Sequence, residues 1–155
     1  MFIRTRQSKG VIFQLGSSPS IDQQNQTQIA AMLDAGELFL GIQFNGTPEG
    51  YTVGGVRLDD GNNHLIEVVR NITLVQVKIN GSEYFRKTIS ASGQLDVQLL
   101  YLGGVPPNAR VNFRPSGTPD YSNFKGIIQD VQVTIRSGEM IPSRFRNSAL
   151  FGIGK

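Results

Sequence analysis

The feature that most constrains the fold of this chain is an alternation of apolar and polar residues with a period of two. The apolar residues on one face of segment 37–44 are Leu38, Leu40, Ile42 and Phe44. Phe39 is the exception on the other face, and the same alternation recurs over residues 73–80 and 130–136. Because successive side chains of a strand point to opposite faces, the pattern predicts half-buried antiparallel strands, each with one face in water.

Shorter apolar runs predict further strands over residues 11–15, 64–70 and 97–102. Asn80–Gly81 lies between two such runs and is the strongest hairpin signal in the chain, because a type I′ turn needs positive φ at both positions. The last run is followed by Gly-Gly-Val-Pro-Pro at 103–107, which predicts a strand that gives way to a shaped loop. Many short strands at regular spacing predict an all-β sandwich or barrel.

Segment 27–36 is ambiguous between helix and strand. Thr27 can cap a helix, good helix formers follow it, and Gly36 closes the segment, so local propensity alone favours a helix. We nevertheless expect a strand here, because a β-sandwich can override a weak local preference.

The composition supports an all-β domain and argues against a nucleic-acid partner. The chain has 155 residues, of which 17% are charged and 18 are glycine, and it has no cysteine or tryptophan. This length suits one domain, and the glycine content and low charge indicate a turn-rich fold. The net charge of +3 favours acidic partners weakly. The chain lacks the dense basic stripe and interleaved aromatic residues that nucleic-acid binding uses.

Two signals about cellular location point in different directions. No apolar run approaches the roughly 20 residues of a membrane span, and no signal-peptide pattern follows Met1. We therefore expect no membrane insertion by this domain, and either a soluble chain or a part cut from a longer one. The lack of cysteine leans towards a reducing compartment or is uninformative. Four Asn-X-Ser/Thr sequons indicate the opposite, glycosylation and an extracellular location, unless they occur by chance. They begin at Asn25, Asn45, Asn71 and Asn80.

Catalytic chemistry has little support in the sequence. With no cysteine and a single histidine, any Ser-His-Asp triad or metal-histidine site would have to use His64, which we interpret as a structural histidine that satisfies loop backbone. Glycoside hydrolysis needs two carboxylates about 5 to 9.5 Å apart across one cleft. The 12 acidic residues are scattered along the chain. We therefore predict no catalytic residues, and a protein that is not an enzyme.

Four stretches in order resemble the laminin G-like domain, also called the laminin, neurexin and sex-hormone-binding-globulin module. They are residues 2–13, the Asp-Gly-X-X-His turn at 60–64, Leu-Tyr-Leu-Gly-Gly-Val-Pro at 100–106, and Phe-X-Gly-X-Ile-X-X-Val at 124–131. The resemblance covers residues 2 to about 135. It implies a two-sheet antiparallel jelly-roll β-sandwich of the concanavalin-like type, formed by one domain over 1–155 that is part of a larger extracellular protein. It also implies that ligands bind at loop rims.

The sequence departs from the family pattern in ways that bear on its disulfide and its calcium site. Ile127 stands where the family commonly has a disulfide-bonded cysteine, so that disulfide is absent. Gln26, Thr27 and Gln28 stand where the first calcium-binding aspartate is expected, with Asp22 and Asp96 as the nearest substitutes. Asp59–Asp60 lies in a turn, where solvated carboxylates are the commoner explanation. We expect no cofactor and assign no metal ligand, and calcium binding stays an open alternative.

Basic residues late in the chain are the candidate ligand-binding side chains. They are Arg110, Arg114, Arg136, Arg144 and Arg146. If they meet at one rim, their planar guanidinium groups suit the sulfate groups of glycans; otherwise they are scattered solvated charges. The sequence thus favours a non-enzymatic extracellular module that binds a protein or a sulfated glycan through its rim loops. The alternatives are a lectin-like or carbohydrate-processing sandwich and a structural or homophilic spacer.

Overall fold

A computed structural model describes residues 1–16, 27–44, 47–71, 74–88, 99–104 and 123–132, which contain ten strands and no helix. The strands are β1 (Phe2–Arg4), β2 (Gly10–Gly16), β3 (Gln28–Asp34), β4 (Glu37–Phe44), β5 (Thr47–Val53), β6 (His64–Asn71), β7 (Leu74–Ile79), β8 (Ser82–Thr88), β9 (Leu99–Leu102) and β10 (Ile127–Gln129). No helix capable of spanning a bilayer occurs among the described residues.

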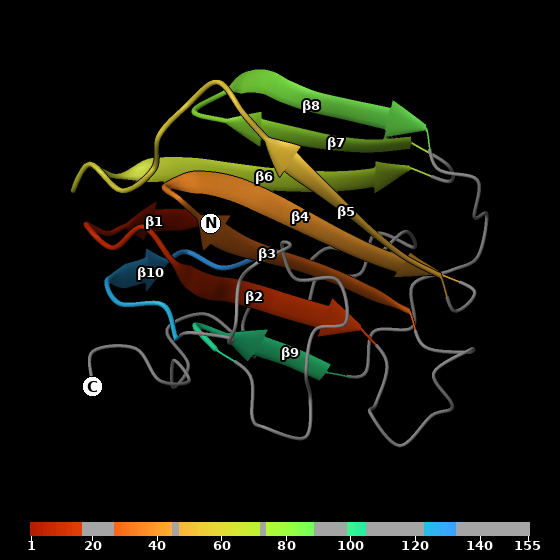
Figure 1. The fold of residues 1–155 in the computed structure, drawn as a ribbon, viewed down its shortest axis with the longest axis horizontal. Coiled ribbons are helices and arrows are strands. Elements are labelled where there is room, and N and C mark those ends of the chain that lie inside the picture. The colour runs from red at the N-terminus through yellow and green to blue at the C-terminus, as the bar shows by residue number, and fades with distance from the viewer. Residues whose placement is uncertain (17–26, 45–46, 72–73, 89–98, 105–122, 133–155) are drawn as a thin grey trace.

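The strands form two five-stranded antiparallel sheets that pack as a sandwich (Figure 1). One sheet has the order β10-β1-β6-β7-β8 and the other has the order β5-β4-β3-β2-β9. Strands far apart in the chain pair within each sheet, as β1 does with β10 and β2 does with β9. The predicted all-β antiparallel sandwich is confirmed.

The core between the sheets follows the period of two in the sequence. On β7, Val75, Val77 and Ile79 are at most 1% exposed, whereas the polar residues between them are partly exposed. Leu38, Leu40 and Ile42 of β4 enter the same core from the other sheet, as predicted. Two apolar inner faces therefore hold the sandwich together.

The structure confirms two predicted local features and adds a turn that the sequence did not indicate. Asn80 and Gly81 have φ values of 54° and 87°, the signs that a type I′ turn needs. Segment 27–36 contains strand β3, and a second turn with positive φ, Ala35 at 53° and Gly36 at 83°, connects it to β4. Gly36 therefore closes a hairpin rather than a helix.

Two strand predictions need correction. Residues 130–132 of the strand expected over 130–136 are not in a strand, because the described pairing with β1 covers Ile127–Gln129 and Asp130 then has a φ of 53°. Residues 133–136 lie outside the described ranges. The expectation that one face of β4 lies in water is wrong, and β3 beside it is likewise buried on both faces. On their outer faces Ala30, Met32 and Phe39 are buried and form a second apolar cluster with Val11 of β2. Phe39, the exception in the alternation, belongs to this cluster.

Candidate functional site

One end of the sandwich gathers five connections between strands. The connections there are residues 5–9 between β1 and β2, 35–36 between β3 and β4, 54–63 between β5 and β6, 80–81 between β7 and β8, and 123–126 before β10. Main-chain hydrogen bonds join them across the two sheets. Gly36 N–H donates to Ser8 O at 3.0 Å, Leu58 N–H to Gly36 O at 2.8 Å, and Gly61 N–H to Thr5 O at 2.8 Å. The connections 5–9, 35–36 and 54–63 of this rim are therefore hydrogen-bonded to one another, at the left of Figure 1.

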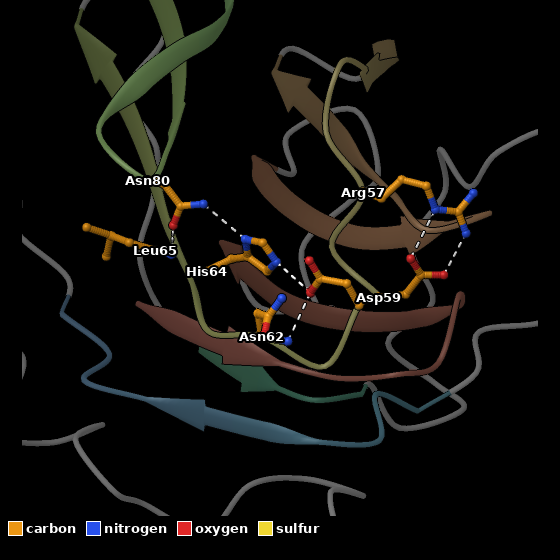
Figure 2. A network of polar contacts seen from close by, with 7 residues as sticks. Arg57, Asp59, Asn62, His64, Leu65 and Asn80 are labelled. Atoms are coloured by element: carbon orange, nitrogen blue, oxygen red, sulfur yellow. Dashed lines mark hydrogen bonds and ion pairs between the residues drawn. The ribbon is translucent and has the colours of Figure 1, made fainter.

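His64 lies at the centre of a polar network on this rim (Figure 2). Its side chain is 8% exposed, and both ring nitrogens have partners. Nε2 is 2.8 Å from Asp60 Oδ1, and Nδ1 is 3.0 Å from Asn80 Nδ2. Asp60 Oδ1 also accepts the Asn62 N–H at 2.9 Å, which closes a local turn.

The hydrogen-bond directions in this network follow from one main-chain donor. Leu65 N–H donates to Asn80 Oδ1 at 2.9 Å, so the amide nitrogen of Asn80 must face His64 Nδ1 and donate to it. Nδ1 is then an acceptor, and Nε2–H donates to Asp60. Contacts with Asn62 and His64 lower the pKa of Asp60 to about 2. Both ring nitrogens of His64 are thus engaged by side chains rather than by the loop backbone that we expected.

Arg57 and Asp59 form a second, separate pair on the same loop. Arg57 Nε and Nη2 donate to the two Asp59 carboxylate oxygens at 3.1 and 2.7 Å (Figure 2). The hydrogen bond from Arg57 is the main cause of the lowered pKa of Asp59. The pair lies against the Ala35–Gly36 turn, because a Cβ on Gly36 would come within 2.8 Å of both side chains. Asp59 and Asp60 therefore form hydrogen bonds that stabilise the loop, in keeping with their interpretation as turn residues.

Four exposed basic side chains on the rim form what we call the basic rim: Arg4, Arg6, Lys9 and Lys125. Segments 4–10 and 123–126, which carry them, contain no acidic residue. Within the described part of the chain none of the four has an ion-pair partner, whereas Arg57 and Arg86 each have one. The basic rim is thus a local concentration of positive charge that its own segments do not neutralise.

The two segments of the basic rim lie side by side because Phe124 and Thr5 hold them together. Phe124 is fully buried and its N–H donates to Gly103 O at 2.7 Å. A Cβ on Gly10 would lie 2.7 Å from the Phe124 Cα, so only glycine permits this approach. The Thr5 hydroxyl donates to Lys125 O at 2.5 Å. These contacts bring Lys125 next to a segment some 120 positions earlier in the chain.

The outer face of the β5-β4-β3-β2-β9 sheet bears on the carbohydrate-processing alternative. Gln14, Gln28 and Gln43 are buried on this face beside the second apolar cluster. Of the described residues on this face, the acidic ones are Asp34 and Glu37, which pair across the hairpin next to its turn. Among the described residues, the middle of the face is therefore formed by buried glutamine and apolar side chains rather than by two carboxylates across a cleft.

The residues predicted as sites fall mostly outside the described ranges. This applies to Arg110, Arg114, Arg136, Arg144 and Arg146, to the sequon residues Asn25 and Asn45, and to the calcium candidates Asp22 and Asp96. Asn71 ends β6, and its side chain is also outside these ranges; Asn80 is described. Within the described ranges, no three histidine, cysteine, aspartate or glutamate side chains come together as a metal site requires. Sequence reasoning missed the basic rim, although Arg-Thr-Arg followed by Lys9 without an acid was a visible signal.

Comparison with known proteins identifies the family. The sequence model described as the laminin G domain matches residues 3–137. The chain belongs to the laminin G domain family. The resemblance to the laminin G-like domain is thereby confirmed. Phe124, Ile128 and Val131 of the last stretch are all buried in the core. Comparison with curated proteins returned no match.

Two solved structures of laminin G domains share the fold of this chain. Domains LG4-5 of the mouse laminin alpha1 chain superpose with a TM-score of 0.63 and 20% identity, over 96% of this chain and 37% of that one. The LG1-3 region of the laminin alpha2 chain superposes with a TM-score of 0.52 and 24% identity, over 69% of this chain and 19% of that one. The chain thus spans 37% of the first structure and 19% of the second. Laminin G domains are typically extracellular binding modules without catalytic activity.

Proposed function

We propose that this laminin G domain is a non-enzymatic, extracellular interaction module within a larger adhesion, matrix or receptor protein, and that its rim binds a sulfated glycan. The observation that carries the proposal is the basic rim, formed by Arg4, Arg6, Lys9 and Lys125 on a domain of a binding family. Burying or clustering like charges without counter-charges costs stability, so uncompensated clusters are most easily explained by an anionic partner.

The chemistry of the rim suits sulfate groups. Guanidinium groups donate two parallel hydrogen bonds to an oxyanion, and ammonium groups add point charges. Arg6 is also positioned, since a Cβ on Gly61 would come within 2.8 Å of its guanidinium carbon. A side chain that rests on a neighbouring peptide loses less conformational freedom on binding than one free in solvent. The predicted arginines at 110, 114, 136, 144 and 146 remain candidates for extending this site.

Two features of the described residues support the proposed absence of enzymatic activity. Both nitrogens of His64 are engaged by Asp60 and Asn80, which leaves the histidine no free lone pair for a substrate. Asp34 and Glu37 flank a tight turn rather than the middle of the sheet face. Neither His64 nor the pair of Asp34 and Glu37 is therefore placed to act on a substrate, and we assign the domain a binding role.

The proposal is tested by retention on immobilised heparin across a salt gradient. Three double variants each lower the formal net charge from +3 to +1: Arg6→Ala/Lys9→Ala on the basic rim, Arg110→Ala/Arg114→Ala, and the control Lys78→Ala/Arg86→Ala on β7 and β8. We expect the parent to elute above physiological salt and the rim variant to elute earlier, with a salt slope reduced by about one per lost contact.

Each outcome discriminates. An equal shift in the rim and control variants would mean that only net charge matters and would contradict a rim site. A shift confined to Arg110→Ala/Arg114→Ala would keep the glycan as the ligand and move the site to residues 110–114. Parent elution at or below physiological salt would overturn the glycan ligand and leave a protein partner for the module.

A further inference from the structure

Asn80 combines a modification motif with a structural role. Asn80-Gly81-Ser82 is the one sequon whose asparagine side chain lies within the described residues. The asparagine occupies the first position of the β7–β8 hairpin turn, and its own N–H donates to Leu65 O at 2.8 Å. The turn is therefore tied to the start of β6 by main chain and by side chain.

The Asn80 amide has a fixed orientation. Leu65 N–H can only donate, so Oδ1 must face it, and Nδ2 must face His64 Nδ1 at 3.0 Å. His64 is held from its other side by Asp60 and is nearly fully buried. Although Asn80 as a residue is exposed, its Nδ2 points inward to the imidazole, as Figure 2 shows.

Glycan transfer makes a demand on that same nitrogen. The new bond joins Asn80 Nδ2 to C1 of a sugar; the nitrogen gives up a proton, and the phosphate carrier leaves from the sugar. The acceptor nitrogen must therefore reach a transferase and a phosphate-activated sugar. In the folded domain this requires the amide to rotate away, which breaks both the His64 and the Leu65 hydrogen bonds. The buried Nδ1 of His64 would then lack its donor, an arrangement that folded proteins avoid.

We propose that folding closes the Asn80 sequon: the amide is committed to His64 and Leu65, and Asn80 accepts a glycan only before the β7–β8 hairpin docks on the start of β6. Steric shielding of the turn is not the cause, because a Cβ on Gly81 would meet no atom within 4 Å. The turn tip is open while the acceptor atom next to it is engaged. Glycosylation and the native loop network thus compete for one nitrogen.

The test uses a soluble N-glycosyltransferase with nucleotide-activated glucose, acting on the purified, folded full chain. Peptide mass spectrometry follows glucose addition at Asn80, and a synthetic peptide of residues 74–88 gives the rate for an unconstrained sequon. We expect the folded chain to react at Asn80 at least about tenfold more slowly than the peptide, because only transiently opened molecules react. In His64→Leu, which removes the acceptor of the Nδ2 hydrogen, the rate should rise towards that of the peptide.

A second variant separates the amide lock from poor access to the turn. Gly81→Asn/Glu83→Thr adds an acceptor one position further along, at the open tip, and does not require His64 to be changed. Fast reaction at position 81 with slow reaction at Asn80 in the same molecule supports the lock. Equally slow reaction at both positions would show that the whole turn is inaccessible, and a rate at Asn80 equal to that of the peptide would show that the amide is free. Either result overturns the inference. The assay is independent of heparin binding, so the glycan-binding proposal can fail while this one stands.

Discussion

Ile127 and Ile128 offer a matched test of the strand that closes the sheet beside the basic rim. Both belong to β10, carry the same side chain and are adjacent in sequence, yet Ile127 is 37% exposed and Ile128 is 4% exposed. Their different environments follow from the register, which pairs Ile128 with the buried Ile3 and Ile127 with the exposed Arg4. Replacing either isoleucine by alanine therefore removes the same atoms, from a buried site at Ile128 and from an exposed site at Ile127.

The expected magnitudes differ widely. Isoleucine to alanine at a buried site costs about 2–5 kcal/mol, because transfer free energy is lost and a cavity remains. A surface substitution usually changes stability by less than about 0.5 kcal/mol. Ile128→Ala should thus be less stable than Ile127→Ala by about 2–4 kcal/mol. For a domain of this size that corresponds to a lowering of Tm by roughly 5–15 °C.

Urea unfolding of the parent and both variants, followed by circular dichroism, measures the difference. The midpoint should fall for Ile128→Ala with an unchanged m value, which indicates a change in stability alone. A shift of the pairing by one residue would exchange the two faces, so a larger loss for Ile127→Ala would contradict the register between β10 and β1. Losses equal within about 0.5 kcal/mol would show that β10 is not packed on the core.

Two further predictions concern titration. The pKa of Asp60 is lowered from 3.8 to about 2, so its contribution to stability should be full above about pH 4 and should be lost as the pH falls through about 2. The urea midpoint should therefore fall less between about pH 5 and pH 2 in Asp60→Asn than in the parent. An equal fall in both proteins would refute the role given to the contacts of Asp60 with Asn62 and His64. Burial, and then the hydrogen bond to Glu49 at 2.5 Å, raise the pKa of Tyr51 to about 12, so stability should decline as the pH rises above about 10, where unfolded tyrosine ionises. Ultraviolet titration of tyrosinate should show one late transition that moves lower, although not fully to 10.0, in Glu49→Gln; a transition that does not move would contradict the contribution of the carboxylate.

Local patterns predicted strands such as β4 and β7 well, because a strand that buries one face must alternate in sequence, whereas β1, β5 and β10 were not predicted. Glu37–Phe44 was predicted with its observed bounds, and Asn80–Gly81 was predicted as the hairpin turn. The Ala35–Gly36 turn was not predicted, because alanine rarely adopts positive φ. Its conformation is stabilised by tertiary hydrogen bonds from Gly36 to Ser8 and from Leu58 to Gly36, which no local pattern reveals.

The candidate site was harder to predict than the fold, because it depends on contacts between distant segments. His64 was predicted to be structural, but its partner Asn80 is 16 positions away and is brought to it by the β6–β7 pairing. Lys125 joins the basic rim only because β10 pairs with β1. Searching for clusters of arginine along the chain favoured late residues and overlooked basic residues that only the fold places together.

The histidine network and the basic rim are connected, which gives His64 an indirect role in the proposed binding surface. Asp60 holds His64, and the next residue, Gly61, donates its N–H to Thr5 O, between Arg4 and Arg6. The guanidinium group of Arg6 rests on Gly61. Loss of the His64 contacts would free the loop that supports Arg6, although no network atom need touch the ligand. If folding keeps Asn80 free of a glycan, its amide stays on His64, and the loop at 54–63 keeps the conformation that positions the basic rim.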